Sequence, residues 1–164
     1  MCAPAAAAEA IPPALLAHMR AEFPDLEVLD RRHAPPEILD FLPSREIGQS
    51  SPFACAGDLD GDGLRDVAVL LRDRRTRTLK LVAFHQTRER GYRAVVLADL
   101  QGIRLEADEK TNKYLVCERP GRKRDAGGGI IRVKHDAVTL ATREKACQLC
   151  YFDKGQSRSA ITCD

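Results

Sequence analysis

From Gly57 to its end, the chain is a series of short segments rich in Val, Ile, Leu and Thr, separated by Gly, Asp, Asn and Arg. Segments of this length and composition are typical of β-strands joined by tight turns, which favours a β meander. The pattern predicts eight strands, at residues 67–71, 78–85, 92–98, 113–117, 130–135, 137–141, 146–152 and 157–163. The segments 88–91 and 153–156 have the composition of hairpin turns.

The residues before Gly57 have a different character. Residues 12–23 are predicted to form a helix, because proline opens the segment and its apolar residues share one helical face. These apolar residues are Leu15, Leu16, Met19 and Phe23. An extended piece at 26–29 and a helical turn or two at 35–43 are expected to follow.

These elements predict an α+β, β-rich fold: an antiparallel meander sheet of about eight short strands, an N-terminal helix, and one EF-hand-like loop feeding a strand. Residues 13–164 are expected to form one domain, since the sequence contains no internal repeat and no second long hydrophobic block. Residues 1–12 are predicted to be a flexible leader or the stump of a signal peptide, with Cys2 where a bacterial lipoprotein carries its lipid anchor. Residues 118–129, basic and rich in glycine, are predicted to be a solvated loop.

Six cysteines in 164 residues favour an oxidising, extracytoplasmic location. Cys147 and Cys150 form a C-x-x-C motif, but residues three apart on a strand face opposite sides about 10 Å apart, which argues against a redox or zinc site. A three-residue turn at 154–156 would place Cys147 opposite Cys163 and allow a disulfide between them. A slipped register would pair Cys150 with Cys163 instead.

The charge balance narrows the choice of partner. Twenty-six Lys and Arg against 24 Asp and Glu leave a net charge of only +2, which is too balanced for a protein that coats phosphates or an anionic membrane. Nucleic acid is therefore not an expected partner. Aromatic residues make up 5% of the chain and Trp is absent, which argues against a base-stacking surface. No run of eighteen apolar residues occurs, so no transmembrane segment is predicted.

The sequence also lacks the common catalytic motifs. It contains no G-x-S-x-G elbow, no H-E-x-x-H and no phosphate-binding P-loop, and its four histidines are scattered and interpreted as ordinary residues. An Asp-x-Asp pair also begins phosphatases of the haloacid dehalogenase type, but there it follows a buried strand, and residues 51–56 are not predicted to be one. The chain is therefore predicted not to be an enzyme.

The strongest local signal is an acidic loop at residues 58–66. Its carboxylates fall at relative positions 1, 3, 5 and 9, and such crowding usually accompanies a hard divalent cation. A loop of this spacing binds its cation through side chains at 1, 3 and 5, the backbone carbonyl at 7, and position 9 directly or through water. The predicted ligands are Asp58, Asp60, Asp62, Leu64 and Asp66. Because all of them donate oxygen, calcium is the expected cofactor.

Two features separate this loop from an EF-hand. At relative position 12, where an EF-hand carries a bidentate Glu, Val69 lies within an apolar run. The flanks also differ, because residues 50–53 cannot form an entering helix and residues 67–71 are β-branched and apolar. The pattern indicates a loop that feeds a strand.

The segment from Asp58 to Leu71 resembles the calcium loop of FG-GAP and VCBS-type repeats, D-x-D-x-D-G-x-x-D followed by a hydrophobic strand, with Phe53 and Gly57 close to their customary places. The resemblance implies calcium bound as a structural clip between strands of an extracytoplasmic protein. Such repeats usually occur in several copies that form propeller blades, and this chain has one copy. The later strands bear a vague resemblance to small periplasmic lysozyme-inhibitor-like and immunity-type proteins.

The functional expectation is a non-catalytic, extracytoplasmic calcium-binding protein, in the bacterial periplasm or secreted, in which calcium is structural and the activity is protein–protein binding. One alternative is an inhibitor or immunity protein against a lysozyme-like cell-wall hydrolase. A second alternative is a small hydrolase whose active site forms no local motif.

Overall fold

The computed structural model describes residues 11–40, 51–143, 145 and 147–163, so the predicted leader and Cys2 lie outside the described residues. The helices are α2 (Pro13–Glu22), the 3-10 turn η1 (Arg31–His33) and α3 (Pro36–Asp40). The strands are β1 (Leu26–Val28), β2 (Ala54–Gly57), β3 (Asp66–Asp73), β4 (Thr78–Gln86), β5 (Tyr92–Arg104), β6 (Lys113–Glu118), β7 (Gly121–Arg124), β8 (Ile130–Val133), β9 (Ala137–Thr142), β10 (Cys147–Asp153) and β11 (Gln156–Cys163). None of the described helices is long and apolar enough to span a membrane.

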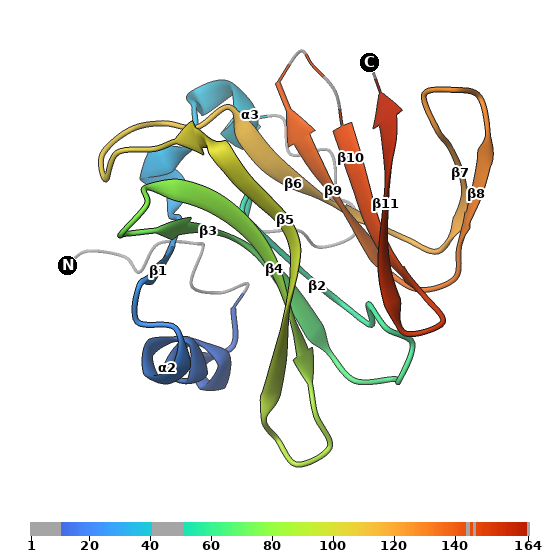
Figure 1. Cartoon of the computed structure of the whole chain (residues 1–164), viewed down its shortest axis with the longest axis horizontal. Coiled ribbons are helices and arrows are strands. Elements are labelled where there is room, and N and C mark those ends of the chain that lie inside the picture. The colour runs from blue at the N-terminus through green and yellow to red at the C-terminus, as the bar shows by residue number, and fades with distance from the viewer. Residues whose placement is uncertain (1–10, 41–50, 144, 146, 164) are drawn as a thin grey trace.

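The strands form two sheets and a separate two-stranded ribbon (Figure 1), and every pairing is antiparallel. In the five-stranded sheet the order is β1-β3-β4-β5, and β2 pairs with β3 as well. The four-stranded sheet has the order β11-β10-β9-β6, and β7 pairs with β8 alone. The β-rich α+β class is confirmed, although the strands lie in three sheets and not in one meander.

The five-stranded sheet lies between two other layers. On one face, Leu70 and Leu81 pack with Leu115 and Phe152 of the four-stranded sheet in the larger core. On the other face, α2 packs against β3 and β4 in a second core, through residues that include Leu15. Because both faces are covered, all eight residues of β3 are buried, which explains its near-continuous apolar sequence.

Two disulfides and one buried thiol account for the described cysteines. Cys55 on β2 and Cys117 on β6 are bonded with a Cα–Cα distance of 5.4 Å, which joins the two sheets covalently. Cys147 and Cys163 are bonded with a Cα–Cα distance of 5.0 Å, which confirms the predicted pair. Cys150 is buried and free. Two disulfides fit an oxidising, extracytoplasmic location.

The turn that joins β10 to β11 differs from the prediction. Asp153 pairs with Gln156, so the turn has two residues, Lys154 and Gly155, and not three. Their φ angles of 51° and 75° are both positive, as a type I′ hairpin turn requires. A register shift between Cys147 and Gln148 adds the missing residue and brings Cys147 opposite Cys163.

All eight predicted strands are present, and so are the helix at 12–23 and the extended piece at 26–29. Their ends agree within a few residues, except that β5 continues to Arg104, well beyond the predicted end at residue 98. Besides the single sheet and the three-residue turn, two further predictions were wrong. Residues 51–56 were not expected to form a strand, yet β2 includes Ala54 to Ala56. These residues are a strand because they pair antiparallel with β3. The sheets remain antiparallel, unlike the α/β frame of a haloacid dehalogenase. Residues 118–129 were expected to be a loop, yet they contain β7.

The ribbon of β7 and β8 is attached to the four-stranded sheet at several points. Val133 is buried, and Lys134, which follows it, lies 2.9 Å from Asp153. At the far end, the backbone N–H of Ala126 donates to the carbonyl of Ile161 on β11 at 2.8 Å. The ribbon therefore has one side turned toward the protein and one turned away from it.

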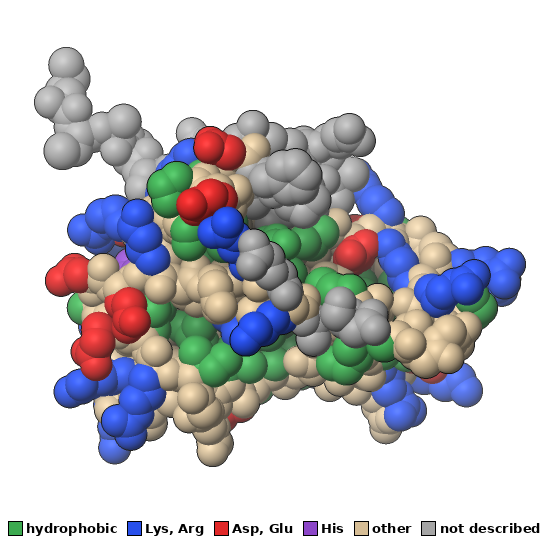
Figure 2. All heavy atoms as spheres, turned by 90° about the horizontal axis from the view of Figure 1, so that it is seen from above, with side chains coloured by type: hydrophobic (Ala, Val, Ile, Leu, Met, Phe, Trp, Pro, Cys, Tyr) green, Lys and Arg blue, Asp and Glu red, His purple; other side chains and the backbone are tan. Residues whose placement is uncertain are grey.

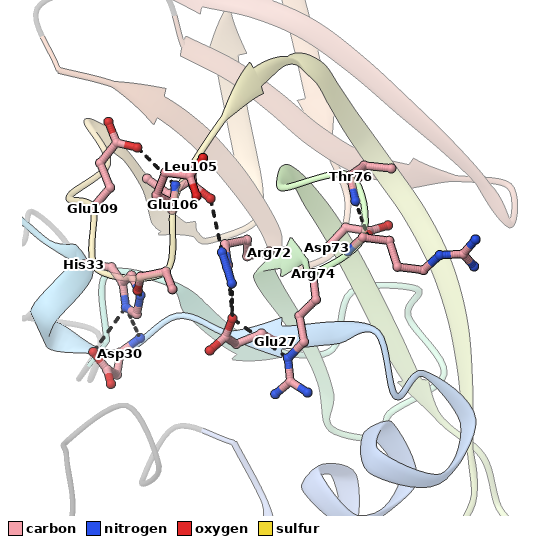
Figure 3. A network of polar contacts seen from close by, with 12 residues as sticks. Glu27, Asp30, His33, Arg72, Asp73, Arg74, Thr76, Leu105, Glu106 and Glu109 are labelled. Atoms are coloured by element: carbon pink, nitrogen blue, oxygen red, sulfur yellow. Dashed lines mark hydrogen bonds and ion pairs between the residues drawn. The ribbon is translucent and has the colours of Figure 1, made fainter.

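A polar network closes the end of β3 that lies farthest from the acidic loop (Figure 3). Arg72 is only 8% exposed; its guanidinium donates to Glu27 of β1 at 3.0 Å and to the carbonyl of Leu105 at 3.2 Å. Nearby, His33 Nε2 lies 2.9 Å from the carbonyl of Ala107. These contacts tie β1, η1 and the segment after β5 to the five-stranded sheet.

Candidate metal centre

The acidic loop joins β2 to β3. The two strands pair as far as Gly57 and Asp66, so residues 58–65 are the loop of a β-hairpin. Within it, Gly61 and Gly63 have φ angles of 85° and 84°. Only glycine adopts this left-handed conformation without steric cost, so these two positions set the shape of the loop.

Three aspartates are drawn together inside this loop. Asp58 accepts hydrogen bonds from the backbone N–H groups of Gly61 at 2.8 Å and Gly63 at 3.1 Å. Asp60 accepts one from the N–H of Asp62 at 3.2 Å. One carboxylate oxygen from each of the three aspartates lies within 4.8 Å of the other two. Three of the five predicted ligands therefore converge.

The other two predicted ligands have different surroundings. Leu64 is half-buried, and its backbone N–H donates to Asp62 at 2.8 Å. Asp66 is fully buried, and its carboxylate accepts hydrogen bonds from the backbone N–H groups of Leu59 and Gln86, each at 3.0 Å. Asp66 thus holds the start of the loop against β4.

His85 on β4 lies beside Asp60 and Asp66, and the three side chains form a second group that could hold a metal ion. The sequence did not predict that His85 lies there. The side chain is 2% exposed, and its Nδ1 lies 3.0 Å from Asp66 and 3.3 Å from Asp60. Because an ionised carboxylate only accepts hydrogen bonds, Nδ1 is the donor in these contacts. Nε2 is buried and has no hydrogen-bond partner among the described residues, and the ring packs edge-on against Phe152.

The position of His85 could have been predicted from the register of β3 and β4. Val67 of β3 pairs with Phe84 of β4, and the two strands keep one register as far as Arg72 and Leu79. Extending that register by one residue sets Asp66 opposite His85. A correct prediction of the β3–β4 turn length would therefore have placed His85 beside the loop.

The pKa of Asp60 reflects both its burial and the other charged groups of the site. Burial raises the pKa of Asp60 above its ordinary value, and the negative charge of Asp66 raises it further, against the opposing effects of the Asp62 N–H and His85. A cation among these carboxylates acts in the opposite direction, because it stabilises their ionised forms.

The loop is also fastened to the turn between β8 and β9. The N–H of Asp58 donates to the Asp136 carboxylate at 3.0 Å, and the N–H of Asp136 donates to the carbonyl of Asp58 at 3.1 Å. A Cβ on Gly61 would lie 2.2 Å from the ring of His135, and one on Gly57 would lie 2.5 Å from the Asp136 carboxylate. Glycine is therefore required at both positions for this close packing.

Comparisons of the chain with models of protein families, with curated proteins and with solved structures find no match. Its function is therefore argued from the site itself.

Proposed function

We propose that this chain is a non-catalytic, extracytoplasmic calcium-binding protein in which calcium is structural, and that it acts by binding another protein. The direct ligands are the carboxylates of Asp58, Asp60 and Asp62 and the carbonyl of Leu64, and Asp66 contributes directly or through water. The observation that carries the proposal is the convergence of three carboxylates in a loop that joins two strands of one sheet and is bonded to the turn before β9 of the other.

The donor set fits calcium better than it fits other common cations. All the proposed ligands are oxygens, which hard cations prefer, and a carboxylate oxygen that accepts one N–H bond keeps a second acceptor position. Zinc favours histidine and cysteine, whereas the Nδ1 atom of His85 is already hydrogen-bonded to Asp66. Magnesium keeps several of its waters in a strict octahedron and usually takes only one or two carboxylates from the protein. A loop that supplies several adjacent carboxylates therefore suits calcium better.

The structural role of the calcium ion follows from the hydrogen bonds that Asp58 makes. Its carboxylate closes the loop through Gly61 and Gly63, and its backbone exchanges two hydrogen bonds with Asp136. The ion supplies the positive charge that offsets repulsion among the carboxylates. Ordering the loop therefore fixes the β8–β9 turn relative to the five-stranded sheet, as the resemblance to FG-GAP and VCBS-type loops implies.

Calcium binding is tested by isothermal titration and by thermal melts in EDTA and in 1 mM calcium. A dissociation constant of about 0.1 to 1 mM, as in extracellular modules, corresponds to about 0.4 to 1.4 kcal/mol of added stability at 1 mM calcium. The melting temperature should rise by a few degrees. The double variant Asp60→Asn/Asp62→Asn should lose the response, and the control Asp99→Asn/Asp108→Asn, which makes the same charge change on exposed residues, should retain it.

Two results would contradict the proposal. One is identical melts in EDTA and calcium together with no heat of titration. The other is a double variant that responds to calcium as the parent does.

A further inference from the structure

The ribbon of β7 and β8 and the residues that flank it are strongly basic. Residues 119–134 contain six basic residues and one acidic residue, a net charge of +5, so the remaining residues together carry −3 although the whole chain is +2. Basic side chains project from the end of the molecule that this ribbon forms (Figures 1 and 2). The overall balance, which argued against an anionic partner, conceals this separation of charge.

The arginines of the ribbon share its outer face. Arg122 pairs directly with Arg132, and Arg124, two residues along β7, points to the same side as Arg122. The opposite side faces the protein, since it carries Lys123, which is paired with Glu118, together with the buried Val133. The ribbon therefore presents three guanidinium groups outward.

These guanidinium groups have no counter-ion among the described residues. Within the part of the chain that the structure describes, Arg122, Arg124 and Arg132 are exposed and make no ion pair or side-chain hydrogen bond. Like charges directly opposite one another destabilise a β-ladder, so the Arg122–Arg132 pair costs stability in the isolated protein. Ile130, which pairs with Arg124 on the same face, is 51% exposed.

We propose that this outer face docks on the surface of an anionic lipid bilayer. Guanidinium groups bind phosphate in a bidentate manner, and the exposed Ile130 beside them can contact the apolar boundary below the headgroups. Lipid headgroups move laterally and can gather under arginines at any spacing, whereas an acidic protein must hold carboxylates at matching positions. A basic ribbon exposed at one end of the molecule can reach an extended surface without hindrance from the other described residues (Figures 1 and 2), and this docking is independent of the calcium loop.

The test is co-sedimentation of the full chain with vesicles in 1 mM EDTA, which removes bridging by divalent cations. Vesicles of phosphatidylcholine with 30% phosphatidylglycerol should bind the protein in 50 mM NaCl, and vesicles of phosphatidylcholine alone should not. Binding should weaken in 300 mM NaCl, because exposed charges are screened. The triple variant Arg122→Gln/Arg124→Gln/Arg132→Gln should bind about a hundredfold more weakly, given the usual contribution of each basic residue near such a surface.

A second triple variant, Arg20→Gln/Arg88→Gln/Arg104→Gln, makes the same charge change at exposed arginines outside the ribbon and should bind like the parent. The ribbon variant should melt no lower than the parent, because like-charge repulsion is removed, so loss of binding cannot be attributed to unfolding. Equal losses in both triple variants, or equal binding to both vesicle types, would overturn the proposal. Binding to poly-L-glutamate without binding to vesicles would overturn it in favour of an acidic protein partner.

Discussion

Asp66 and His85 lie one residue beyond the last pair of β3 and β4, and their side chains meet at 3.0 Å in a position where both are buried. The same carboxylate holds the backbone of Leu59, at the start of the acidic loop. The geometry of an exposed loop is therefore set by a buried polar pair beneath it.

Replacing His85 with leucine should destabilise the protein by at least about 2 kcal/mol, because the buried Asp66 carboxylate loses one of its donors. Urea unfolding of the parent, His85→Leu, Asp66→Asn and the double variant gives the coupling between the two side chains. The double variant should lose less stability than the sum of the single variants. Strict additivity would show that the pair contributes nothing beyond its separate parts.

The two disulfides should differ in their contribution to stability. Cys55 and Cys117 are 62 residues apart and Cys147 and Cys163 are 16 apart, which corresponds to about 4 and about 3 kcal/mol of loop-closure entropy. Double alanine variants of each pair, compared by chemical denaturation under oxidising conditions, should therefore show the larger loss for the first. The reverse order would mean that loop length does not decide their contributions.

Cys150 should be chemically inert in the folded protein. Burial raises the pKa of its thiol to about 12, so almost no thiolate is present at pH 8. Iodoacetamide at pH 8 should label Cys150 only after unfolding in guanidinium chloride, as mass spectrometry of the intact chain would show. Stoichiometric labelling of the native protein within minutes would be inconsistent with the buried position.

Asp73 should make stability depend on pH. Burial alone would raise its pKa, but donors on Thr76, Lys80 and Arg75 outweigh that effect and hold the pKa below its ordinary value. The stability that these contacts give is therefore present above about pH 4, the ordinary pKa, and is lost as the pH falls through the lower pKa of the folded state.

Asp73→Asn should accordingly lose about 1 to 2 kcal/mol at pH 7, and the difference from the parent should shrink in acid. Urea unfolding at pH 7, 5 and 3 checks this, with the exposed Asp108→Asn as the control. A difference that stays constant with pH would mean that the carboxylate charge plays no part.

The strand positions could be predicted because segment composition and turn residues are local properties. The grouping into two sheets could not, because it depends on which faces are covered. The apolar run 67–71 is compatible with one covered face or two, and only the packing of α2 on the far side decides between them. The bond between Cys55 and Cys117 was missed for the same reason, since it depends on β2 lying next to β6.

In the candidate site, the three aspartates Asp58, Asp60 and Asp62 converge because their spacing and the glycines determine the loop locally. His85 comes from another strand, and its place depends on a long-range register. The Cys147–Cys163 pair was predicted although the turn length was wrong, because a bulge compensated for the shorter turn.

The hydrogen bond between Ala126 and Ile161 has a consequence for self-association. β11 is the outermost strand of its sheet, and an open strand edge can template the addition of another chain. This bond takes one backbone position on that edge and holds the arginine-bearing ribbon alongside it. Because that position is already paired and the ribbon beside it carries exposed positive charge, we expect edge-to-edge pairing of β11 with a second copy to be disfavoured.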